Sequence, residues 1–317
     1  MEYRRLGRTN LDVSLLGLGS GGPSQLGQRS GIPESEVHTL IDVALGLGVN
    51  LIDTAAAYRE SEAILGRALK GKPRESYVLC TKTGPAIRDG DQSRPRTEAE
   101  LVASLESSLQ RLGTDVIDVF QIHAVTPDTY AHTRDVLVPE LLRQRGRGKI
   151  RFLGITEAFA SDHERSTLQT ALADDIWDTI LVGYNLLTPG PEDDVLPLAQ
   201  ANDVGVLVMC AVRRKIARQA DLEALVASLK RASLIDADAL PDEAPLDWLL
   251  HDGIERVTDA AYKYAANTPL VHSVLTGTAS LEHLRENVDA VLGPPLPDAD
   301  RERLKAIFAP TGRKLGD

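Results

Sequence analysis

Short apolar runs alternate with longer segments of helical periodicity along most of the chain. The runs are a few residues long and rich in leucine, isoleucine and valine, which is typical of buried strands. They cover residues 15–19, 50–53, 76–82, 115–123, 149–156, 179–185, 204–210 and 271–277. Residues between them show helical spacing, as in residues 34–48, where apolar side chains recur every three or four positions. The pattern therefore predicts a series of strand–helix units.

Local signals mark where several of these elements begin and end. Thr97 and Glu100 form a capping-box pattern ahead of a leucine-rich helical segment. A helix is expected over residues 133–145, ending at Gly146, and the last helix of the series over residues 280–293. The opening stretch YRRLGRTNLDVSLL predicts two short strands around a turn. These signals agree with the unit boundaries set by the apolar runs.

The order of the elements indicates the fold class. Strands that are apolar along their whole length, each followed by a helix, form a parallel sheet covered on its outer face. Eight such units in 317 residues favour a closed (β/α)8 TIM barrel over an open doubly wound sheet. No long low-complexity linker divides the chain, and the polar stretch 236–247 is interpreted as an inserted loop. We therefore expect residues 1–317 to form a single barrel domain, with an inserted helical segment after strand seven.

The glycine-rich stretch GLGSGG (17–22) matches the template of dinucleotide-binding Rossmann turns. That template requires a helix that opens directly on the third glycine. Here PSQLGQRSGIP follows instead, and the next helical pattern starts near Glu34. We interpret the stretch as a loop of the barrel.

Composition and charge exclude several classes of protein. The chain is 43% hydrophobic and 26% charged, as in ordinary globular proteins, and its net charge of −11 argues against nucleic acid or an anionic membrane as partner. No apolar run is long enough to span a bilayer, and MEYRRLGRTN has no signal-peptide pattern. Cys80 and Cys210 lie in apolar runs and are interpreted as reduced core thiols. A cytoplasmic location without a metal site is expected.

Polar residues with catalytic chemistry stand at the ends of three predicted strands. Asp53, Lys82 and His123 occupy these ends, and Tyr58 follows one loop away. Active sites of TIM barrels form at the carboxyl ends of the strands. Taken singly, the aspartate could cap a helix, the histidine could be a core residue, and the lysine could be solvated or form a Schiff base. Together they make a candidate catalytic site.

Several motifs carry a resemblance to a known family. LIDTAAAYRESEAILGRAL, VLCTKTG, IDVFQIH, GKIRFLGIT, YNLL and GTASLEHLRENV stand in the order found in the aldo-keto reductase superfamily, and the chain resembles that family over nearly its whole length. The resemblance implies a barrel plugged at its base by the N-terminal hairpin. It also implies reduction of a carbonyl group with a nicotinamide cofactor.

The resemblance gives each of the four residues a role. Tyr58 would protonate the carbonyl oxygen, and a phenol with a pKa near 10 does this reluctantly at neutral pH. A nearby ammonium on Lys82 would lower that pKa, and Asp53 would keep the ammonium charged and in place. His123 would hydrogen-bond the same oxygen and orient the substrate.

The nicotinamide side of the implied cofactor site departs from the family pattern. The family commonly holds the carboxamide with serine and asparagine after strand five and with glutamine on strand six. Thr156, Glu157 and Leu181 stand at these positions, and Met209 replaces a frequent aromatic residue. An ionised Glu157 can accept a hydrogen bond but cannot donate one.

The adenosine side is closer to the family. Gly277, Thr278 and Ser280 stand where the last strand opens onto a helix N-terminus, which suits a phosphate. The remaining expected cofactor contacts are Ser20, Glu286, Asn287, His283 in place of the family's usual arginine, and Arg213 and Arg214, which could equally be exposed loop cations. NADP(H), the family default, is expected ahead of NAD(H).

Three functions are compatible with these residues. The first is an oxidoreductase acting on a small aldehyde, ketone or sugar; the second is a nicotinamide-binding sensor or regulatory subunit with little turnover; the third is a Schiff-base aldolase on Lys82. The expected pocket rim comprises residues 84–96, 124–132 and 215–267, and the first of these carries Arg88, Asp89, Asp91 and Arg94, which favours a hydroxylated or charged substrate. Trp248 is interpreted as packing the inserted segment rather than covering the pocket. The sequence leaves the oligomeric state open.

Overall fold

The computed structural model describes residues 1–22, 24–90, 92–312 and 315. Eight parallel strands within these residues close into a barrel, in the order β3, β4, β5, β8, β9, β10, β11 and β12, with β12 pairing back to β3. Their bounds are Leu16–Gly19, Leu51–Asp53, Val78–Thr83, Ile117–Val125, Ile150–Glu157, Thr179–Gly183, Gly205–Met209 and Ser273–Thr276. The predicted barrel is thus confirmed, with strand ends that differ by only a few residues.

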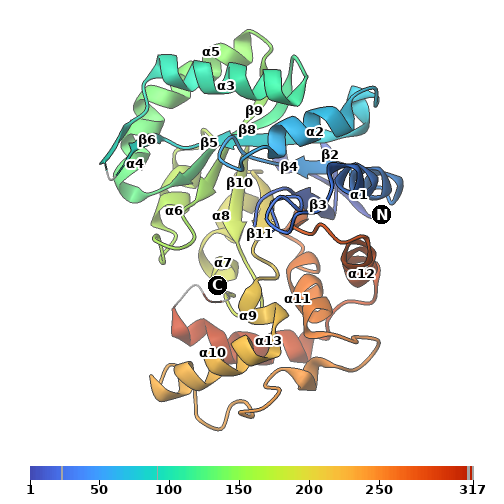
Figure 1. Cartoon of the computed structure of the whole chain (residues 1–317). Helices are drawn as coiled ribbons and strands as arrows, with labels where there is room; N and C mark the ends of the chain where they lie inside the picture. Colours follow the sequence, from blue (N-terminus) through green and yellow to red (C-terminus); the bar gives the residue numbers. More distant parts are fainter. Residues whose placement is uncertain (23, 91, 313–314, 316–317) are drawn as a thin grey trace.

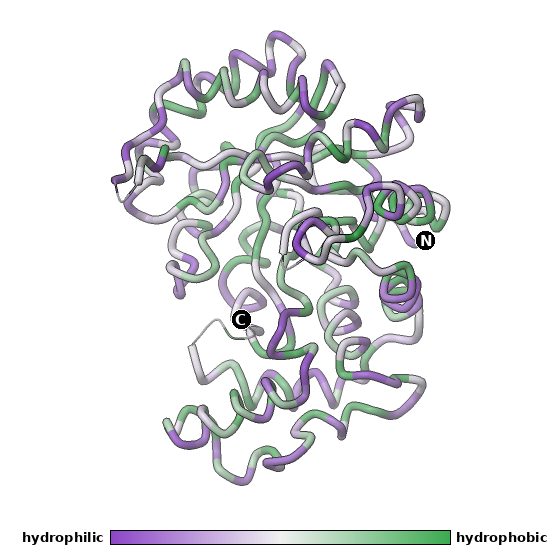
Figure 2. Tube along the Cα trace, in the orientation of Figure 1, coloured by the Kyte–Doolittle hydropathy of each residue, from purple (hydrophilic) through white to green (hydrophobic). Residues whose placement is uncertain are grey.

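Helices surround the barrel on its outside (Figure 1). They are α1 (Glu34–Gly46), α2 (Ser61–Leu69), α3 (Glu98–Leu112), α4 (Pro127–His132), α5 (Val138–Gly146), α6 (Ser166–Ala173), α7 (Pro191–Asp194), α8 (Leu196–Ala201) and α12 (Leu281–Leu292). Thr97 caps α3, and the capping box with Glu100 is present as predicted. The apolar side chains of the strands and the inward helix faces form the main core, and Figure 2 shows the barrel strands as largely hydrophobic segments.

The helix expected from residue 133 begins earlier. Residues Thr133–Leu137 form a π-helical turn (η3) that joins α4 directly to α5. Pro127 occupies the first turn of α4, where its missing N–H is not needed, and the Thr126 N–H donates to Thr129 Oγ1 at 2.9 Å. The polar sequence of α4 gives little apolar periodicity, so pattern alone did not predict this turn of helix.

The N-terminal hairpin closes the bottom of the barrel, as predicted. Strands β1 (Tyr3–Arg5) and β2 (Asp12–Ser14) pair antiparallel around the 3₁₀ turn η1 (Gly7–Thr9). Its side chains form one apolar cluster with the barrel interior, made of Leu6, Leu11, Val13, Leu51, Val78, Cys80, Val119, Leu181 and Leu207. Gly7 has φ +48°, and a Cβ there would lie 2.3 Å from the backbone nitrogen of Gly205. With the amino end sealed, only the carboxyl end of the barrel can admit a ligand.

The segment inserted after β11 is helical, as predicted. It contains α9 (Arg214–Ala217), α10 (Gln219–Arg231), a 3₁₀ turn η4 (Asp247–Leu249) and α11 (Val257–Ala266). A helix that the pattern did not predict, α13 (Asp298–Phe308), follows α12 and lies against the insertion. Arg303 of α13 stacks over the ring of Trp248 at 4.0 Å, so this tryptophan packs the insertion, as expected.

Two loops at the carboxyl end bear on the site. Residues 17–19 of GLGSGG belong to β3, and residues 24–31 form turns before α1 begins at Glu34, so the stretch does not lead directly into a helix as a Rossmann turn does. The rim segment 84–96 forms a hairpin of β6 (Ala86–Asp89) and β7 (Gln92–Pro95), and Asp91 lies outside the described residues.

Within the described part of the chain, no helix is both long and apolar enough to cross a bilayer.

Candidate active site

Asp53 and Lys82 form a buried ion pair at the carboxyl end of the barrel. They extend from the neighbouring strands β4 and β5, and their residues are only 3% and 1% exposed. The Lys82 ammonium donates to Asp53 Oδ1 and, at 2.8 Å, to the carbonyl oxygen of Thr54. The structure therefore brings together the two residues that the sequence placed on adjacent strand ends.

Tyr58 and His123 complete the group of four. The Tyr58 ring lies edge-on to the His123 ring with centroids 5.7 Å apart, and Lys82 Nζ is 5.4 Å from the Tyr58 centroid. Tyr58 stands in the loop between β4 and α2, and a Cβ at Gly21 would lie 2.7 Å from its Cε2 atom. The absence of a side chain at Gly21 therefore lets the phenol take this position. All four predicted catalytic residues converge.

Burial and charge set the protonation states of these groups. Burial lowers the pKa of Lys82, but the charge and hydrogen bond of Asp53, together with the nearby Tyr58 and Cys80, outweigh burial, and the net pKa is raised. Burial raises the pKa of Tyr58 by more than Lys82 lowers it, so the net direction is opposite to the lowering expected from the sequence. Burial and the Lys82 charge lower the pKa of His123 to about 3. At neutral pH the site holds a protonated phenol, an ammonium and a neutral imidazole.

Gln121 belongs to the same group, and the sequence reasoning missed it. It is fully buried on β8, and its Nε2 donates to Asp53 Oδ2 at 2.9 Å. Side chains two residues apart on a strand share a face, so Gln121 points into the barrel with His123. An amide in a mostly apolar strand, two positions before the histidine, was the available signal.

Of the residues expected around the carboxamide, Thr156, Glu157 and Met209 lie at the ends of β9 and β11, and Leu181 lies in the middle of β10. Thr156 on β9 accepts a hydrogen bond from the Ala124 N–H at 2.7 Å, and Glu157 is buried with its carboxylate accepting from the Gly183 N–H. Leu181 and Met209 pack with the apolar cluster inside the barrel. The carboxylate of Glu157 thus has a structural partner on β10, which the sequence did not indicate.

Cys210 and Arg213 follow β11 at the edge of the site. Cys210 is half-buried with φ +66°, and Arg213 Nη1 donates to its sulfur at 3.1 Å. Arg213 also lies 5.7 Å from the centroid of the Phe159 ring. The expectation of a core thiol is therefore wrong for Cys210, because the chain turns out of the barrel at this residue. It holds for Cys80, whose thiol pKa burial raises well above its usual value.

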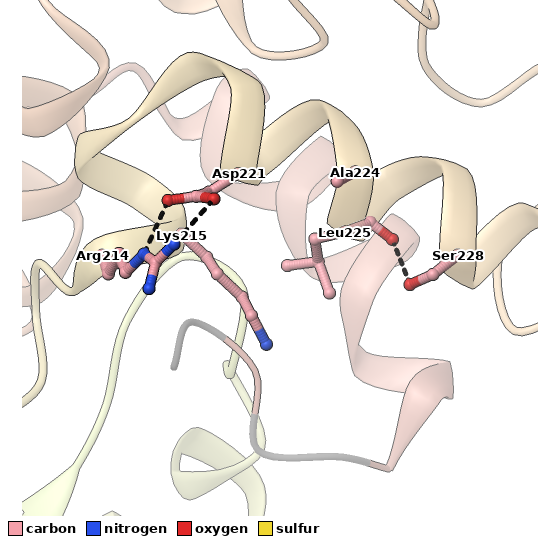
Figure 3. Close-up of a pocket in the computed structure, with 6 residues that line it drawn as sticks. All are labelled: Arg214, Lys215, Asp221, Ala224, Leu225 and Ser228. Atoms are coloured by element: carbon pink, nitrogen blue, oxygen red, sulfur yellow. Dashed lines mark hydrogen bonds and ion pairs between the residues drawn. The ribbon is translucent and has the colours of Figure 1, made fainter.

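Arg214 points to a different place. It pairs with Asp221 of α10 at 2.8 Å and lines a cavity of about 360 Å³ with Lys215 and the α10 side chains Ala224, Leu225 and Ser228 (Figure 3). The ion pair visible in Figure 3 holds Arg214 on the inserted segment. Of the two arginines expected near a pyrophosphate, only Arg213 contacts residues of the site.

The end of β12 and the start of α12 have the chemistry of a phosphate site. Gly277 is exposed, Thr278 Oγ1 accepts from the Ser280 N–H at 3.0 Å, and Ser280 caps the helix by accepting from the His283 N–H at 3.3 Å. His283 is exposed on the first helical turn. A helix N-terminus with two hydroxyl side chains and an exposed glycine is suited to an anion.

Two other expected adenosine contacts, Glu286 and Asn287, are held by protein partners, whereas the hydroxyl of Ser20 has no such partner in the part of the chain that the structure describes. Glu286 forms an ion pair with Arg256, a residue of the inserted segment, and Asn287 Nδ2 donates to Thr276 Oγ1 at 2.8 Å. Ser20 is 1% exposed, its N–H donates to the Asp53 carbonyl at 2.8 Å, and its Oγ has no hydrogen-bond partner within the described residues. An unsatisfied buried hydroxyl beside Asp53, at the end of β3, fits a site completed by a ligand.

Comparison with known proteins agrees with this geometry. The profile described as "Aldo/keto reductase family" matches residues 16–309. The uncharacterized oxidoreductase YqkF of Bacillus subtilis is 27% identical over 99% of this chain and 98% of its own length. The NADH-specific methylglyoxal reductase of Escherichia coli is 29% identical over 97% of this chain and 98% of its own length.

Solved structures show the same likeness. The holo form of aldo-keto reductase AKR11C1 from Bacillus halodurans superposes with a TM-score of 0.72, at 27% identity, over 96% of each chain. The profile match spans nearly the whole barrel, including the four converging residues at its carboxyl end. The chain belongs to the aldo/keto reductase family.

Proposed function

We propose that this protein reduces the carbonyl group of a small aldehyde, ketone or sugar and that Tyr58 is the general acid. The observation that carries the proposal is the convergence of Asp53, Tyr58, Lys82 and His123 at the open end of a sealed barrel. A phenol, an ammonium and a neutral imidazole around one point suit a reaction in which negative charge develops on an oxygen.

Each residue of the site has its own role in the proposed reaction. A nicotinamide cofactor, when bound, supplies the hydride that reaches the carbonyl carbon. Tyr58 donates its proton to the carbonyl oxygen, so the product is the alcohol. Lys82 stabilises the phenolate left on Tyr58, and Asp53 keeps Lys82 protonated. His123 is neutral and donates an N–H to the same oxygen, which orients the substrate.

The residues expected to hold the cofactor fit such a group. We assign the phosphates to Gly277, Thr278, Ser280 and Arg213, the adenosine to His283, Glu286 and Asn287, and the nicotinamide side to Ser20, Thr156, Glu157 and Met209. The free hydroxyl of Ser20 and the open helix N-terminus at Ser280 support this assignment. We do not assign Arg214 to the cofactor phosphates, because its guanidinium pairs with Asp221.

The choice between the two dinucleotides rests on fewer contacts. NADP(H) is the family default and is our proposal. His283 is the residue of the first α12 turn that could approach a 2′-phosphate, and an imidazole offers an anion fewer N–H donors than a guanidinium does. The Escherichia coli relative is named as NADH-specific, so both cofactors belong in the assay.

The substrate is a small molecule with a reactive carbonyl. The E. coli relative is named for methylglyoxal, a small dicarbonyl, and we propose it as the first compound to test. The β6–β7 hairpin places Arg88 in an exposed position near the rim, which favours a polar substrate. A cytoplasmic location and the single-domain organisation stay predictions.

Two other functions give different outcomes. A nicotinamide-binding sensor is favoured by Glu157 and Leu181, because neither offers the carboxamide a hydrogen-bond donor at the site. A Schiff-base aldolase needs a neutral lysine, and the ion pair with Asp53 raises the pKa of Lys82. The geometry therefore favours the sensor over the aldolase as the second candidate.

Steady-state consumption of NADPH and NADH with methylglyoxal and a panel of aldehydes tests the proposal. We expect oxidation of reduced cofactor with formation of one alcohol per cofactor. Tight cofactor binding with no consumption across the panel would point to the sensor. Trapping of a substrate adduct by borohydride without cofactor would point to the aldolase.

A further inference from the structure

We propose that Gln121 is a positioning residue that fixes the carboxylate of Asp53 and thereby holds the Lys82 ammonium beside Tyr58. The inference rests on the proposed function, because it gives Gln121 a task within the same site. Gln121 lies on β8, two residues before His123, and is 0% exposed. Its effect on the reaction passes through Asp53, so it need not touch the substrate.

The two oxygens of Asp53 are divided between two donors. Oδ1 takes the Lys82 ammonium, and Oδ2 takes the amide of Gln121 at 2.9 Å. A carboxylate held at both oxygens cannot rotate without losing a charge-assisted hydrogen bond. The Lys82 ammonium, which is also bound to the Thr54 carbonyl at 2.8 Å, is thereby kept in one place.

Gln121 leaves part of its own hydrogen-bonding capacity unused. Its Oε1 is buried and has no hydrogen-bond partner within the described residues. Turning the amide would place that oxygen against the Asp53 carboxylate, where two acceptors repel. A buried carbonyl without a donor costs stability, so stability alone does not explain an amide at this position. The hydrogen bond from the amide to Asp53 explains it.

The neighbouring strand keeps the Gln121 side chain from moving away. Gly154 of β9 is paired with Gln121, and a Cβ at Gly154 would lie 2.7 Å from Gln121 Cγ and 2.6 Å from Thr179 Oγ1. The glycine gives the side chain just enough room inside the barrel. The amide is thus confined between the backbone of β9 and the carboxylate of Asp53.

The amide is neutral, which matters in a site with few charges. Several titratable groups lie around Asp53 and Gln121. They are Lys82 and Cys80 on β5, Tyr58 after β4, His123 on β8 and Cys210 after β11. A second carboxylate at this position would weaken the electrostatic effect of the Lys82 charge on Tyr58. An apolar residue would leave Asp53 Oδ2 without its hydrogen-bond donor. Glutamine satisfies the oxygen without adding charge.

Three variants of the full-length protein test the proposal. Gln121→Leu removes the donor at similar volume, and Gln121→Glu replaces the amide with a carboxyl of the same shape. Gln144→Leu is the matched control: Gln144 of α5 is also 0% exposed, donates through Nε2 to Glu140, and has an unpartnered Oε1. Both leucine variants lose a buried amide, but of these two amides only that of Gln121 donates to Asp53.

We expect kcat of Gln121→Leu to fall roughly ten-fold or more, the effect of one lost charge-assisted hydrogen bond, with cofactor Kd changed less than about two-fold. Gln144→Leu should keep the wild-type kcat. Gln121→Glu should recover activity at low pH, where its protonated carboxyl donates to Asp53, and lose it as pH rises and the second carboxylate forms. An amide has no such titration, so the wild type should lack this pH limb.

Two results would overturn the proposal: kcat of Gln121→Leu equal to that of Gln144→Leu, or a Gln121→Glu pH profile identical to the wild type. If Gln121→Leu does not fold, the Gln121→Glu profile decides alone. If the wild-type protein reduces no carbonyl, the proposed function fails, and Gln121 is tested without turnover. Ultraviolet titration of the phenolate, with Tyr58→Phe as blank, should then show a higher Tyr58 pKa in Gln121→Leu, and an unchanged pKa would contradict the proposal.

Discussion

At the residue scale, His123 shows how burial selects one protonation state. Its pKa is lowered to about 3, first by burial and then by the charge of Lys82. The imidazole is therefore neutral throughout the physiological range and can donate one N–H without charge. A free histidine, by contrast, would titrate near pH 6.5.

This environment gives a pH prediction for the reaction. Because His123 stays neutral and Tyr58, with its raised pKa, stays protonated, kcat/KM for carbonyl reduction should be flat between about pH 5 and about pH 8. The measurement is a pH–rate profile under conditions where the cofactor is saturating. An inflection near the usual histidine pKa that disappears in His123→Asn would show that the imidazole titrates, contrary to this account.

Lys82 should stabilise the fold in addition to its proposed part in the reaction. Lys82→Met removes the cation and leaves the Asp53 carboxylate buried with Gln121 as its remaining side-chain donor among the described residues. We expect a loss of unfolding free energy of about 1–3 kcal/mol, because the remaining charge is uncompensated. Denaturant titration measures it, and Lys72→Met, which breaks a pair at the surface with Asp42, is the control expected within about 1 kcal/mol of wild type. Equal effects of the two substitutions would argue that the buried pair adds nothing to stability.

At the element scale, side chains at the amino ends of strands bind the backbone of the neighbouring strand. Asp118 accepts from the Leu79 N–H at 2.8 Å, Asp178 from the Leu153 N–H at 2.9 Å, and His272 from the Val206 N–H at 2.9 Å. Each contact joins two adjacent strands of the barrel where their backbone ladder begins. The histidine makes one of these joints sensitive to pH.

His272 should make the barrel less stable in acid. Burial lowers its pKa to about 4, and the unfolded value is near 6.5, so the unfolded chain binds more protons between these values. Its contribution is therefore full above pH 6.5 and is lost as pH falls through about 4. Thermal unfolding at neutral pH and at about pH 4.5 should show a drop that is smaller in His272→Asn, whose amide oxygen can accept the same N–H. An equal drop in both proteins would place the acid sensitivity elsewhere, for example at His123.

The elements differ in how well the sequence predicted them. The barrel strands have dense apolar runs, and their order and ends were predicted to within a few residues. The β6–β7 hairpin is polar and α13 buries few apolar residues, so neither produces a strong periodic signal. The convergence of the four proposed catalytic residues was predictable because strand ends meet at one end of a barrel. Gln121 and the Glu157–Gly183 contact were not, because each depends on which side chains meet across strands.

At the scale of the whole molecule, the hairpin plug determines which end of the barrel is open. Gly7 touches the start of β11, and two hairpin arginines reach the loops below the barrel: Arg5 pairs with Asp203 at 2.7 Å and Arg8 with Asp175 at 2.5 Å. The candidate active site lies at the opposite end because the hairpin fills the barrel interior at its amino end.

Gly7→Ala should unseat this plug. Its Cβ would meet the backbone of Gly205 at 2.3 Å in a left-handed conformation, so we expect a loss of more than about 2 kcal/mol in unfolding free energy. Gly113→Ala is the control, since Gly113 has φ +65° but open space around it, and should cost about 1 kcal/mol. Chemical denaturation of both variants checks the difference. If Gly7→Ala were no worse than the control, the hairpin would have room to adjust.

The proposed reaction depends most directly on Tyr58 as the proton donor to the carbonyl oxygen. The most direct measurement is the single-turnover rate of methylglyoxal reduction by wild type and Tyr58→Phe, with cofactor Kd measured in parallel by fluorescence titration. The phenyl ring keeps the packing against Gly21 and His123 and removes only the hydroxyl. We predict a rate at least about 100-fold lower in Tyr58→Phe, with Kd changed by no more than a few-fold. A variant that retained most of the wild-type rate would contradict the account and remove Tyr58 from the acid role.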